Sequence, residues 1–525
     1  MSNESRLSRA DLRTTRAGTP ARWRYLLAVW AAVFAILFTW SLATPVSAGP
    51  DESGHIVKAA ASVRGDWTGT ATTLIGNRSF DLPANIGNVG GEKTCFAFNS
   101  AQPASCAPSL DDDPSSTMAA ATGAGSYNPV YYLLVGWPSL FLSGEVAIYA
   151  MRAASALLSS FLIAVAFAGV NQLRSGRRIA LTALVVGLTP MAYFLGGVLN
   201  PNGAEVAGVM AFIAVLWLAI TRPELPHRTE IVLLVGGTAA LVCNLRSTSP
   251  LFLLLAAIPV LSACGWSASR AFFSQKVVLW SMAVTAVVAS LGVAWTLLIG
   301  LNAGFIPSSG TQRDGVVTAF VTMLKNTVGY GREMVAVFGW LDTQVPDFIY
   351  MTWTFLVGLV LIGALAIARR RMLVALVLAA VTFLLLPAIL QAPTAADYGY
   401  IWQGRYSLPL FVVVIMIAGL TAAATIGDNA APLQRRLLLL IFGIAGFAHV
   451  VSFFVALKRY VVGTDGGHLA MIIDPSWDPP VTWTVLLGLH ILALAAFAAV
   501  LARTTKTTAE PTSSNAMAEV RTSLT

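Results

Sequence analysis

Apolar residues along this chain come in long runs that are separated by short polar breaks. A run of about 17–25 apolar residues is long enough to cross the hydrocarbon core of a bilayer. Because lipid offers backbone groups no hydrogen-bond partner, a spanning run must be helical. The pattern therefore predicts an all-α polytopic membrane protein with about twelve transmembrane helices, over residues 25–45, 148–170, 179–199, 204–221, 229–245, 249–265, 277–300, 350–368, 372–390, 407–426, 437–456 and 483–501.

Two stretches have more than one interpretation. Residues 131–143 are apolar but short, and Gly136 and Pro138 interrupt them. A span here would move the basic residues that follow to the other side of the membrane, so we expect an interfacial or re-entrant helix. The first run, with its basic start and the small residues before Gly49, resembles a signal peptide. Its length favours a helix that is retained.

Composition and charge agree with a membrane protein. Of the 525 residues 56% are hydrophobic and 11% are charged, whereas a soluble domain has roughly 25% charged residues. The formal charge of +8 does not indicate a nucleic-acid partner, because basic residues cluster in the short breaks on one side of the predicted path. Cytoplasmic loops collect such residues. We therefore expect a multi-pass protein of the plasma membrane whose two termini are cytoplasmic.

This topology divides the chain into a transmembrane domain and two tails. Residues 1–23 and 502–525 are predicted to be disordered cytoplasmic tails, and residues 24–501 form the membrane domain. Its first external loop covers 46–147, and further external segments cover 301–349, 391–406 and 457–482. Cys95 and Cys106 both lie in the first external loop, where oxidation to a disulfide is possible.

The stretch GPDESGH, residues 49–55, places three ionisable side chains just beyond the first helix. If it is helical, Asp51 and His55 share one face. A carboxylate such as Asp51 or Glu52 can deprotonate a hydroxyl or bind a divalent cation, and a histidine can assist in either task. Asp51, Glu52 and His55 are thus candidate catalytic residues and a candidate metal site. The alternative is a solvated acidic pair at the start of a helix.

Two arginines are expected at the outer ends of predicted spans, against the general trend. They are Arg246, in CNLRSTSP, and Arg405, in IWQGRYSLP. Guanidinium groups bind phosphate bidentately, although these could instead snorkel or pair with Glu205 or Asp397. Further candidates with weaker or supporting roles are Lys58, Asp342, Gln403, Tyr406, Asn200 and Asn202.

Together these residues predict an outward-facing site at the lipid boundary that combines acids with phosphate-binding cations, in which Asp51 meets Arg405 in a common cavity. A water-soluble sugar nucleotide is not available outside a bacterial cell, whereas a sugar on polyprenyl phosphate is. Such a lipid would keep its tail in the bilayer while its phosphate contacts an arginine.

A family resemblance rests on four motifs in this order: GPDESGH, NPVYY, FGWLDTQVP and QGRYSLPL. The combination resembles a family of multipass membrane proteins, best known from actinobacteria, that looks like the GT-C glycosyltransferases. The similarity covers roughly residues 24–500. It implies a GT-C-like fold whose first external loop bears short interfacial helices. It also implies transfer of a sugar from a polyprenyl-phosphate donor to a glycan or lipid acceptor of the cell envelope, in cell wall biogenesis.

The resemblance also implies roles for individual residues. Asp51 would be the catalytic base or a metal ligand, with Glu52 and His55 assisting, and Arg405 would contact the donor phosphate. Lys58 and Arg246 are weaker candidates for the same phosphate contact, and Asp342 is a weaker supporting candidate, because no GT-C motif matches them directly. Two other functions stay open: a transporter or flippase of lipid-linked saccharides, and a non-catalytic envelope-assembly factor. Transporters often show repeats and ionisable groups near the midplane, neither of which is evident in this sequence.

Overall fold

The computed structural model describes residues 19–110, 113–300 and 314–504. Most of both predicted tails and residues 301–313 of the predicted external segment 301–349 lie outside this range. Residues 19–23, predicted as tail, instead begin helix α2 (Thr19–Ala43). The described chain is mostly helical, which confirms the predicted class of an all-α polytopic membrane protein.

Nine helices of the described chain are long and apolar enough to cross a membrane, and the count rises to eleven if each of two bent pairs is one span. The nine are α2, α6 (Gly144–Asn171), α9 (Pro201–Thr221), α13 (Lys276–Trp295, continued by η5, Thr296–Gly300), α16 (Asp347–Ile367), α17 (Arg370–Gln391), α19 (Gly404–Ile426), α20 (Ala431–Val462) and α22 (Trp483–Thr504). The predicted span over 229–245 is the shorter helix α10 (Arg228–Val242).

Proline and glycine account for the two bent pairs. Helices α7 (Arg177–Gly187) and α8 (Pro190–Gly197) meet at 67°. Pro190 cannot continue α7, because it lacks the N–H and restricts the residue before it. Helices α11 (Ser249–Cys264) and α12 (Trp266–Phe273) meet at 118°. Gly265 joins them with a φ of +87°, a conformation that favours glycine.

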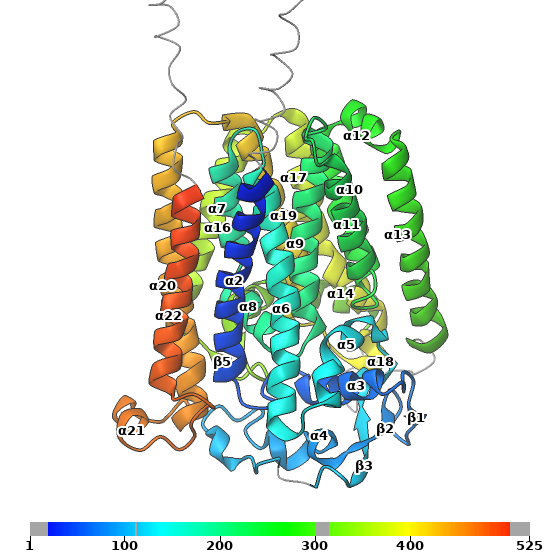
Figure 1. The fold of residues 1–525 in the computed structure, drawn as a ribbon, viewed down its shortest axis with the longest axis vertical. Coiled ribbons are helices and arrows are strands. Elements are labelled where there is room, and N and C mark those ends of the chain that lie inside the picture. The colour runs from blue at the N-terminus through cyan, green and yellow to red at the C-terminus, as the bar shows by residue number, and fades with distance from the viewer. Residues whose placement is uncertain (1–18, 111–112, 301–313, 505–525) are drawn as a thin grey trace, which may run out of the picture.

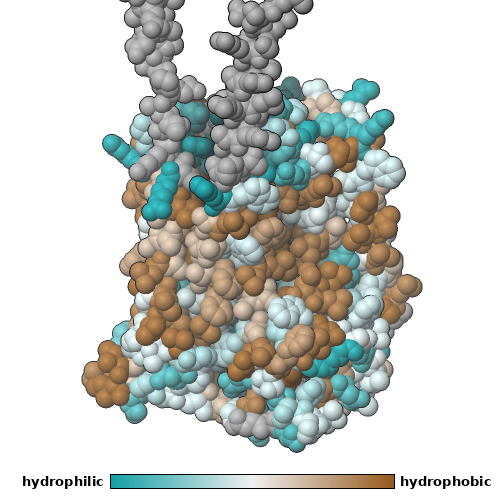
Figure 2. Space-filling model, in the orientation of Figure 1, coloured by the Kyte–Doolittle hydropathy of each residue, from teal (hydrophilic) through white to brown (hydrophobic). Residues whose placement is uncertain are grey.

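The spans form one bundle with distinct ends (Figure 1). Helix α9 is wholly buried in the middle of the bundle, whereas α13 stands at its edge and is mostly exposed. The start of α2 and the end of α22 point toward the end that carries α12, here called the α12 end. Residues 46–110 and 113–147 cover the opposite end, here called the loop end. Apolar side chains gather over the middle of the visible face, between more polar ends (Figure 2).

The loop end combines short helices with two small sheets. Strands β1 (Thr70–Ala71), β2 (Arg78–Pro83) and β3 (Thr117–Thr122) form an antiparallel sheet in that order, and β4 (Val337–Phe338) pairs with β5 (Thr343–Gln344). The short helices are α3 (Glu52–Val63), α4 (Ala84–Gly87), α5 (Pro129–Gly136), α14 (Val316–Lys325), α15 (Thr327–Ala336), α18 (Ala395–Tyr398) and α21 (His468–Ile473), with single turns η1 (Gly91–Thr94), η2 (Ala104–Cys106), η3 (Gly123–Ser126), η4 (Trp137–Leu140) and η7 (Ala392–Thr394).

Residues 131–143 do not form a span. Helix α5 and turn η4 cover 129–140 and pack against α3 and α6. The packing is close at Gly136, where an added Cβ would lie 2.4 Å from the carbonyl oxygen of Ala59. The segment is thus part of the loop end, as the interfacial interpretation predicted.

Arg459, near the end of α20, holds two segments of the loop end to the bundle. Its guanidinium group donates to the carbonyl oxygens of Phe96, Asn99 and Gln102 and to the Asp342 carboxylate, which lies 2.9 Å away. A disulfide joins Cys95 to Cys106 around the same loop. Arg459 is only 1% exposed, so water does not compete with these bonds. One buried cation therefore fixes the disulfide loop and the β4–β5 hairpin together.

Removing this cation should loosen both segments. Arg459→Met would leave the Asp342 carboxylate buried without its partner, and breaking a buried ion pair costs about 3–5 kcal/mol. We expect a lower unfolding temperature in detergent and faster hydrogen exchange in residues 96–102. Adding Asp342→Asn should restore part of the loss. Arg503→Met, at an exposed position, is the control, and an equal effect there would contradict the assignment.

Candidate functional site

The site begins where α2 ends and the chain turns into α3. Arg152, a fully buried residue of α6, donates to the carbonyl oxygens of Ser41, Thr44 and Pro45. The last carbonyls of a helix have no partner within the helix and favour a cation. A single guanidinium group from α6 therefore caps α2 and sets the direction in which the chain leaves it.

The same guanidinium group binds Glu52. Arg152 Nε lies 2.7 Å from Glu52 Oε1 and Nη2 lies 2.6 Å from Oε2, and both side chains are fully buried. The backbone N–H groups of Gly49 and Leu199 also donate to this carboxylate. Glu52 does not line the cavity described below. Its placement thus differs from the expected role beside Asp51: it anchors the turn.

Asp51 points the other way. Its backbone is left-handed, with a φ of +57°, which is unusual for a residue that carries a Cβ. Arg405 Nη2, from the first turn of α19, donates to Asp51 Oδ2. The Arg405 side chain is 3% exposed and that of Asp51 is 55% exposed. The predicted meeting of these two residues, which are 354 positions apart, is therefore present, and the carboxylate stays accessible.

Asp51 lines a cavity of about 1520 Å³ at the loop end. Small-molecule pockets usually measure about 300–1,000 Å³, so this cavity has room for more than one small ligand. Its walls come from α3, the β3 edge, the loop between α10 and α11, and the ends of α13 and α17. The aromatic side chains in these walls are Tyr127, Trp295, Trp340, Tyr398, Trp402 and Tyr406.

Arg246 is the arginine that reaches the cavity wall. Its Nη1 lies 3.1 Å from Glu205 Oε2, and its side chain is 14% exposed. The Ser249 hydroxyl donates a hydrogen bond to the other carboxylate oxygen of Glu205. Nearby, the buried hydroxyl of Thr248 lines the cavity and has no hydrogen-bond partner in the described chain. Glu205 thus fixes Arg246, as the pairing alternative anticipated, yet leaves most of its donors available.

Tyr406 connects the two arginines. Its ring contacts both of them: the ring centroid lies 4.7 Å from the Arg246 guanidinium carbon and 5.0 Å from that of Arg405. Its hydroxyl accepts a hydrogen bond from Arg405. Tyr406 and Arg246 line the cavity, whereas Arg405 lies beneath Asp51 and is not part of the wall. Arg405 is therefore placed to orient Asp51, and Arg246 is placed to meet an anion in the cavity.

His55 also lies in the wall, one helical turn from Asp51. Burial is the main cause that lowers the pKa of His55 to about 3; Arg405 and Arg246 act in the same direction, and Asp51 opposes them. Nδ1 of His55 is 2.9 Å from the Tyr132 hydroxyl. His55 is thus a neutral, hydrogen-bonded side chain at physiological pH. It is not poised as a cation.

Two other candidates lie outside the cavity. The Lys58 ammonium group is fully buried and donates to the carbonyl oxygens of Trp67 and Gly125, at 2.5 and 2.6 Å. Asp342 is the partner of Arg459. Neither residue lines the cavity, so the expected phosphate contact of Lys58 does not fit its placement, and both hold the loop end together.

The remaining candidates support the backbone of the site. Asn200 accepts a hydrogen bond from the N–H of Asn202 at the start of α9, and its side-chain amide donates to the Pro50 carbonyl, next to Asp51. Asn202 is buried. Gln403 precedes the first turn of α19, and its Oε1 is buried without a partner in the described chain. None of the three lines the cavity.

The predicted metal set does not come together. Within the described residues no group of three or more His, Cys, Asp or Glu side chains could hold a metal ion. The reason is the rotation of α3 about its axis, which turns Asp51 toward the cavity and its neighbour Glu52 toward Arg152. If Asp51 binds a divalent cation, a bound molecule such as a phosphate would therefore have to supply further metal ligands.

Sequence reasoning missed the residue that organises the turn. Arg152 lies inside the predicted span over 148–170, and an ionisable residue within a span is a functional candidate by default. That signal was present in the sequence. The pairing of Arg152 with Glu52, 100 positions away, was not.

The fold and the cavity define a class: a multipass α-helical membrane protein with a charged and aromatic cavity at one end of its bundle. The chain belongs to the family described as "Predicted membrane protein (DUF2142)", which matches residues 34–414. A comparison with curated proteins finds no match.

Two solved structures are similar to this chain. ArnT from Cupriavidus metallidurans bound to undecaprenyl phosphate has 13% sequence identity and a TM-score of 0.45, and the match covers 91% of this chain and 77% of that one. The Archaeoglobus fulgidus oligosaccharyltransferase tethered with an acceptor peptide has 12% identity and a TM-score of 0.33, over 86% of this chain and 56% of that one.

Lys58 should make stability depend on pH. Burial is the main cause that lowers its pKa to about 7, whereas an unfolded lysine titrates near 10.4. Between these values the unfolded chain binds more protons, so the free energy of unfolding should rise with pH from about 7 to 10. Lys58→Met should reduce this rise in thermal unfolding measured across that range. Lys325→Met, at an exposed position, should not, and an unchanged slope in Lys58→Met would contradict the prediction.

Proposed function

We propose that the protein is a membrane glycosyltransferase. It moves a sugar from a polyprenyl-phosphate donor to a glycan or lipid acceptor of the cell envelope, on the extracytoplasmic face of the plasma membrane. The observation that supports this most directly is an accessible carboxylate, Asp51, held by Arg405 in the same cavity as the cation of Arg246. Transfer of a sugar from a phosphate leaving group needs a carboxylate to accept the acceptor's proton and a cation to stabilise the departing phosphate.

The reaction needs one base and one anion site. A hydroxyl oxygen of the acceptor attacks the anomeric carbon, and the bond from that carbon to the phosphate oxygen breaks. The hydroxyl proton passes to Asp51, whose Oδ1 makes no hydrogen bond within the described chain, while Arg405 holds Oδ2. The phosphate leaves with an additional negative charge, which Arg246 stabilises. Fixed charges that already point to where the new charge develops are effective at this task.

Access from lipid supports a donor with a long apolar tail. The cavity wall includes Trp295 and Thr296 at the end of α13, and Leu390 at the end of α17. Both helices are candidate spans with large exposed apolar surfaces. A polyprenyl chain could therefore lie against them in the bilayer while its phosphate enters the cavity sideways.

The distribution of charge supports the extracytoplasmic face. The breaks with most basic residues, such as 174–178, 369–371 and 435–436, join helices at the α12 end. Basic residues favour the cytoplasmic side, so the loop end would face outward. The acceptor would then be an envelope component, because such glycans and lipids are assembled there.

Replacing the base should nearly abolish transfer. We expect Asp51→Asn to lower the rate about 10²–10⁴-fold, the usual contribution of general-base catalysis, while the protein stays folded. The assay uses purified protein in detergent with radiolabelled polyprenyl-phosphate hexoses and pentoses and an extract of envelope acceptors. Glu92→Gln is the matched control, because Glu92 is an exposed carboxylate in the same cavity wall. Wild-type transfer by Asp51→Asn would disprove the role.

The two arginines should affect different steps. Arg246→Gln should weaken binding of farnesyl phosphate about tenfold or more, since a hydrogen bond to a charged group contributes roughly 1.5–3 kcal/mol. Arg405→Gln should leave that affinity within about twofold and lower kcat instead, and Arg405→Lys should recover part of the rate. Isothermal titration and initial-rate kinetics separate the two effects. The reverse pattern would assign the phosphate to Arg405.

The same assay distinguishes an enzyme from a carrier. A flippase or exporter needs two sealed compartments, whereas an enzyme forms product in detergent. Product that appears only after reconstitution into sealed vesicles, or no product with any donor, would contradict the proposed reaction.

A further inference from the structure

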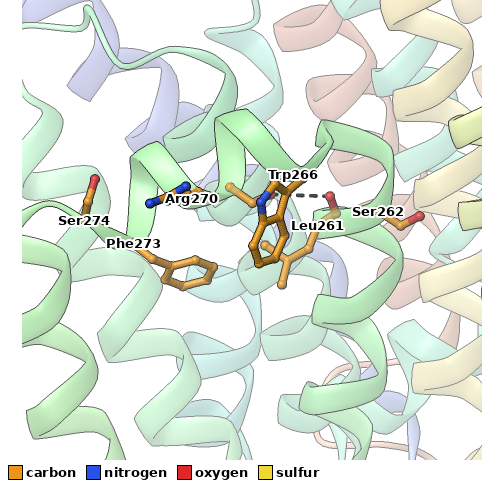
Figure 3. Close-up of a pocket in the computed structure, with 7 residues that line it drawn as sticks. Leu261, Ser262, Trp266, Arg270, Phe273 and Ser274 are labelled. Carbon is orange, nitrogen blue, oxygen red and sulfur yellow. Dashed lines mark hydrogen bonds between the residues drawn. The ribbon is translucent and has the colours of Figure 1, made fainter.

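The α12 end contains a second charged cleft, away from the proposed site. Helix α12 follows α11 after the 118° bend and leads into the candidate span α13, and it lies at one end of the bundle. Beside it is a cavity of about 570 Å³, shown in Figure 3. A cavity of about 530 Å³ adjoins α17, and Ser262 lines both.

Four arginines surround these two cavities. Arg270 lines the first, and Arg369, Arg370 and Arg371 line the second. Arg371 reaches the α11–α12 turn, because its Nη1 lies 2.8 Å from where a Cβ on Gly265 would be. All four side chains are exposed. None forms an ion pair or a hydrogen bond with another residue of the described chain.

The acids of this end are already in use. Glu224 pairs with Arg174 and Arg222, Glu230 pairs with Arg22, and Asp428 pairs with Arg178. The described part of the chain therefore has no carboxylate left at this end to neutralise the four arginines. Four arginines around two cavities that share a lining residue, with no carboxylate partner in the described chain, favour an external anion.

The other lining groups favour an anion that is attached to lipid. Trp266 is 82% exposed beside Arg270, and tryptophan is enriched at the membrane–water boundary. Leu261 and Phe273 add apolar surface to the same cavity, and the serines at 262, 269 and 274 add hydroxyl groups. Farther along the bilayer, α11 exposes Leu254 and Ile258. Acyl chains could pack there.

We propose that this cleft binds an anionic glycerophospholipid, with the headgroup phosphate between Arg270 and Arg369–Arg371 and the acyl chains along α11 and α17. The positive cluster and the interfacial tryptophan match the two parts of such a lipid. The site does not depend on the proposed glycosyltransferase reaction, since the cleft lies at the opposite end of the bundle.

Lipid binding to the purified, delipidated full-length protein tests the proposal. Native mass spectrometry would compare palmitoyl-oleoyl phosphatidylglycerol with the phosphatidylcholine of the same chains. We expect the wild type to retain phosphatidylglycerol preferentially. The triple variant Arg369→Gln/Arg370→Gln/Arg371→Gln should weaken that binding about tenfold or more, since each basic residue near an anionic lipid contributes roughly fivefold. Phosphatidylcholine binding should not change.

A variant of equal charge serves as the control. Arg174→Gln/Arg436→Gln/Arg503→Gln removes three exposed arginines that do not line the cleft, and it should bind phosphatidylglycerol as the wild type does. An equal loss in this control would show a response to net charge only and would overturn the proposal. So would equal binding of both lipids, or displacement of phosphatidylglycerol by millimolar inorganic phosphate, which would indicate a site for a free anion.

Discussion

The buried pair between Arg152 and Glu52 is the interaction on which the loop end depends. Taking two charges out of water is costly, and attraction offsets that cost only when the geometry is good and the remaining donors and acceptors are used. Here they are used: Arg152 also binds three carbonyl oxygens at the end of α2, and Glu52 also accepts from two backbone N–H groups. The pair therefore does more than join α6 to α3. It ends a membrane helix, reverses the chain and fixes the position at which α3 begins.

The position of Asp51 follows from that of Glu52. Neighbouring side chains at the start of a helix point in different directions, so burying Glu52 against α6 turns Asp51 toward the cavity. The left-handed backbone of Asp51 belongs to the same arrangement. Such a conformation typically costs about 1–3 kcal/mol and persists where the surroundings determine it. Three contacts determine it here. Arg152 fixes the neighbouring Glu52, Asn200 donates to the Pro50 carbonyl, and Arg405 donates to the Asp51 carboxylate. One acid of the DE pair is thus structural, and its neighbour is accessible.

Much of this could be predicted from the sequence, and the missing parts have physical causes. The spans were predictable because lipid allows only helices, and the long apolar runs are unmistakable. The approach of Asp51 to Arg405 was predictable because both sit at the same end of predicted spans. The division between Asp51 and Glu52 was not, since it depends on the phase of α3, which a contact from α6 sets. Strand β3 was also missed, because the four residues between the two end threonines of TMAAAT are neither β-branched nor aromatic, the types that favour strands. Likewise, nothing in the local sequence distinguishes Lys58, enclosed by two carbonyl groups, from a lysine that faces a phosphate.

The arginines of this protein divide by environment, and the division explains which ones can act on a ligand. Arg152 and Arg459 are almost fully buried, and acids and carbonyl groups use their donors, so they hold segments together. Arg405 is equally buried, but it shares its charge with a carboxylate that is open to the cavity. Arg246 is tied to Glu205 at one atom and still reaches the cavity wall. The Arg246 guanidinium group is thus held in place by one acid, while most of its N–H donors stay free for a ligand. That is the condition under which an incoming phosphate gains the most, because the site does not have to reorganise to receive its charge.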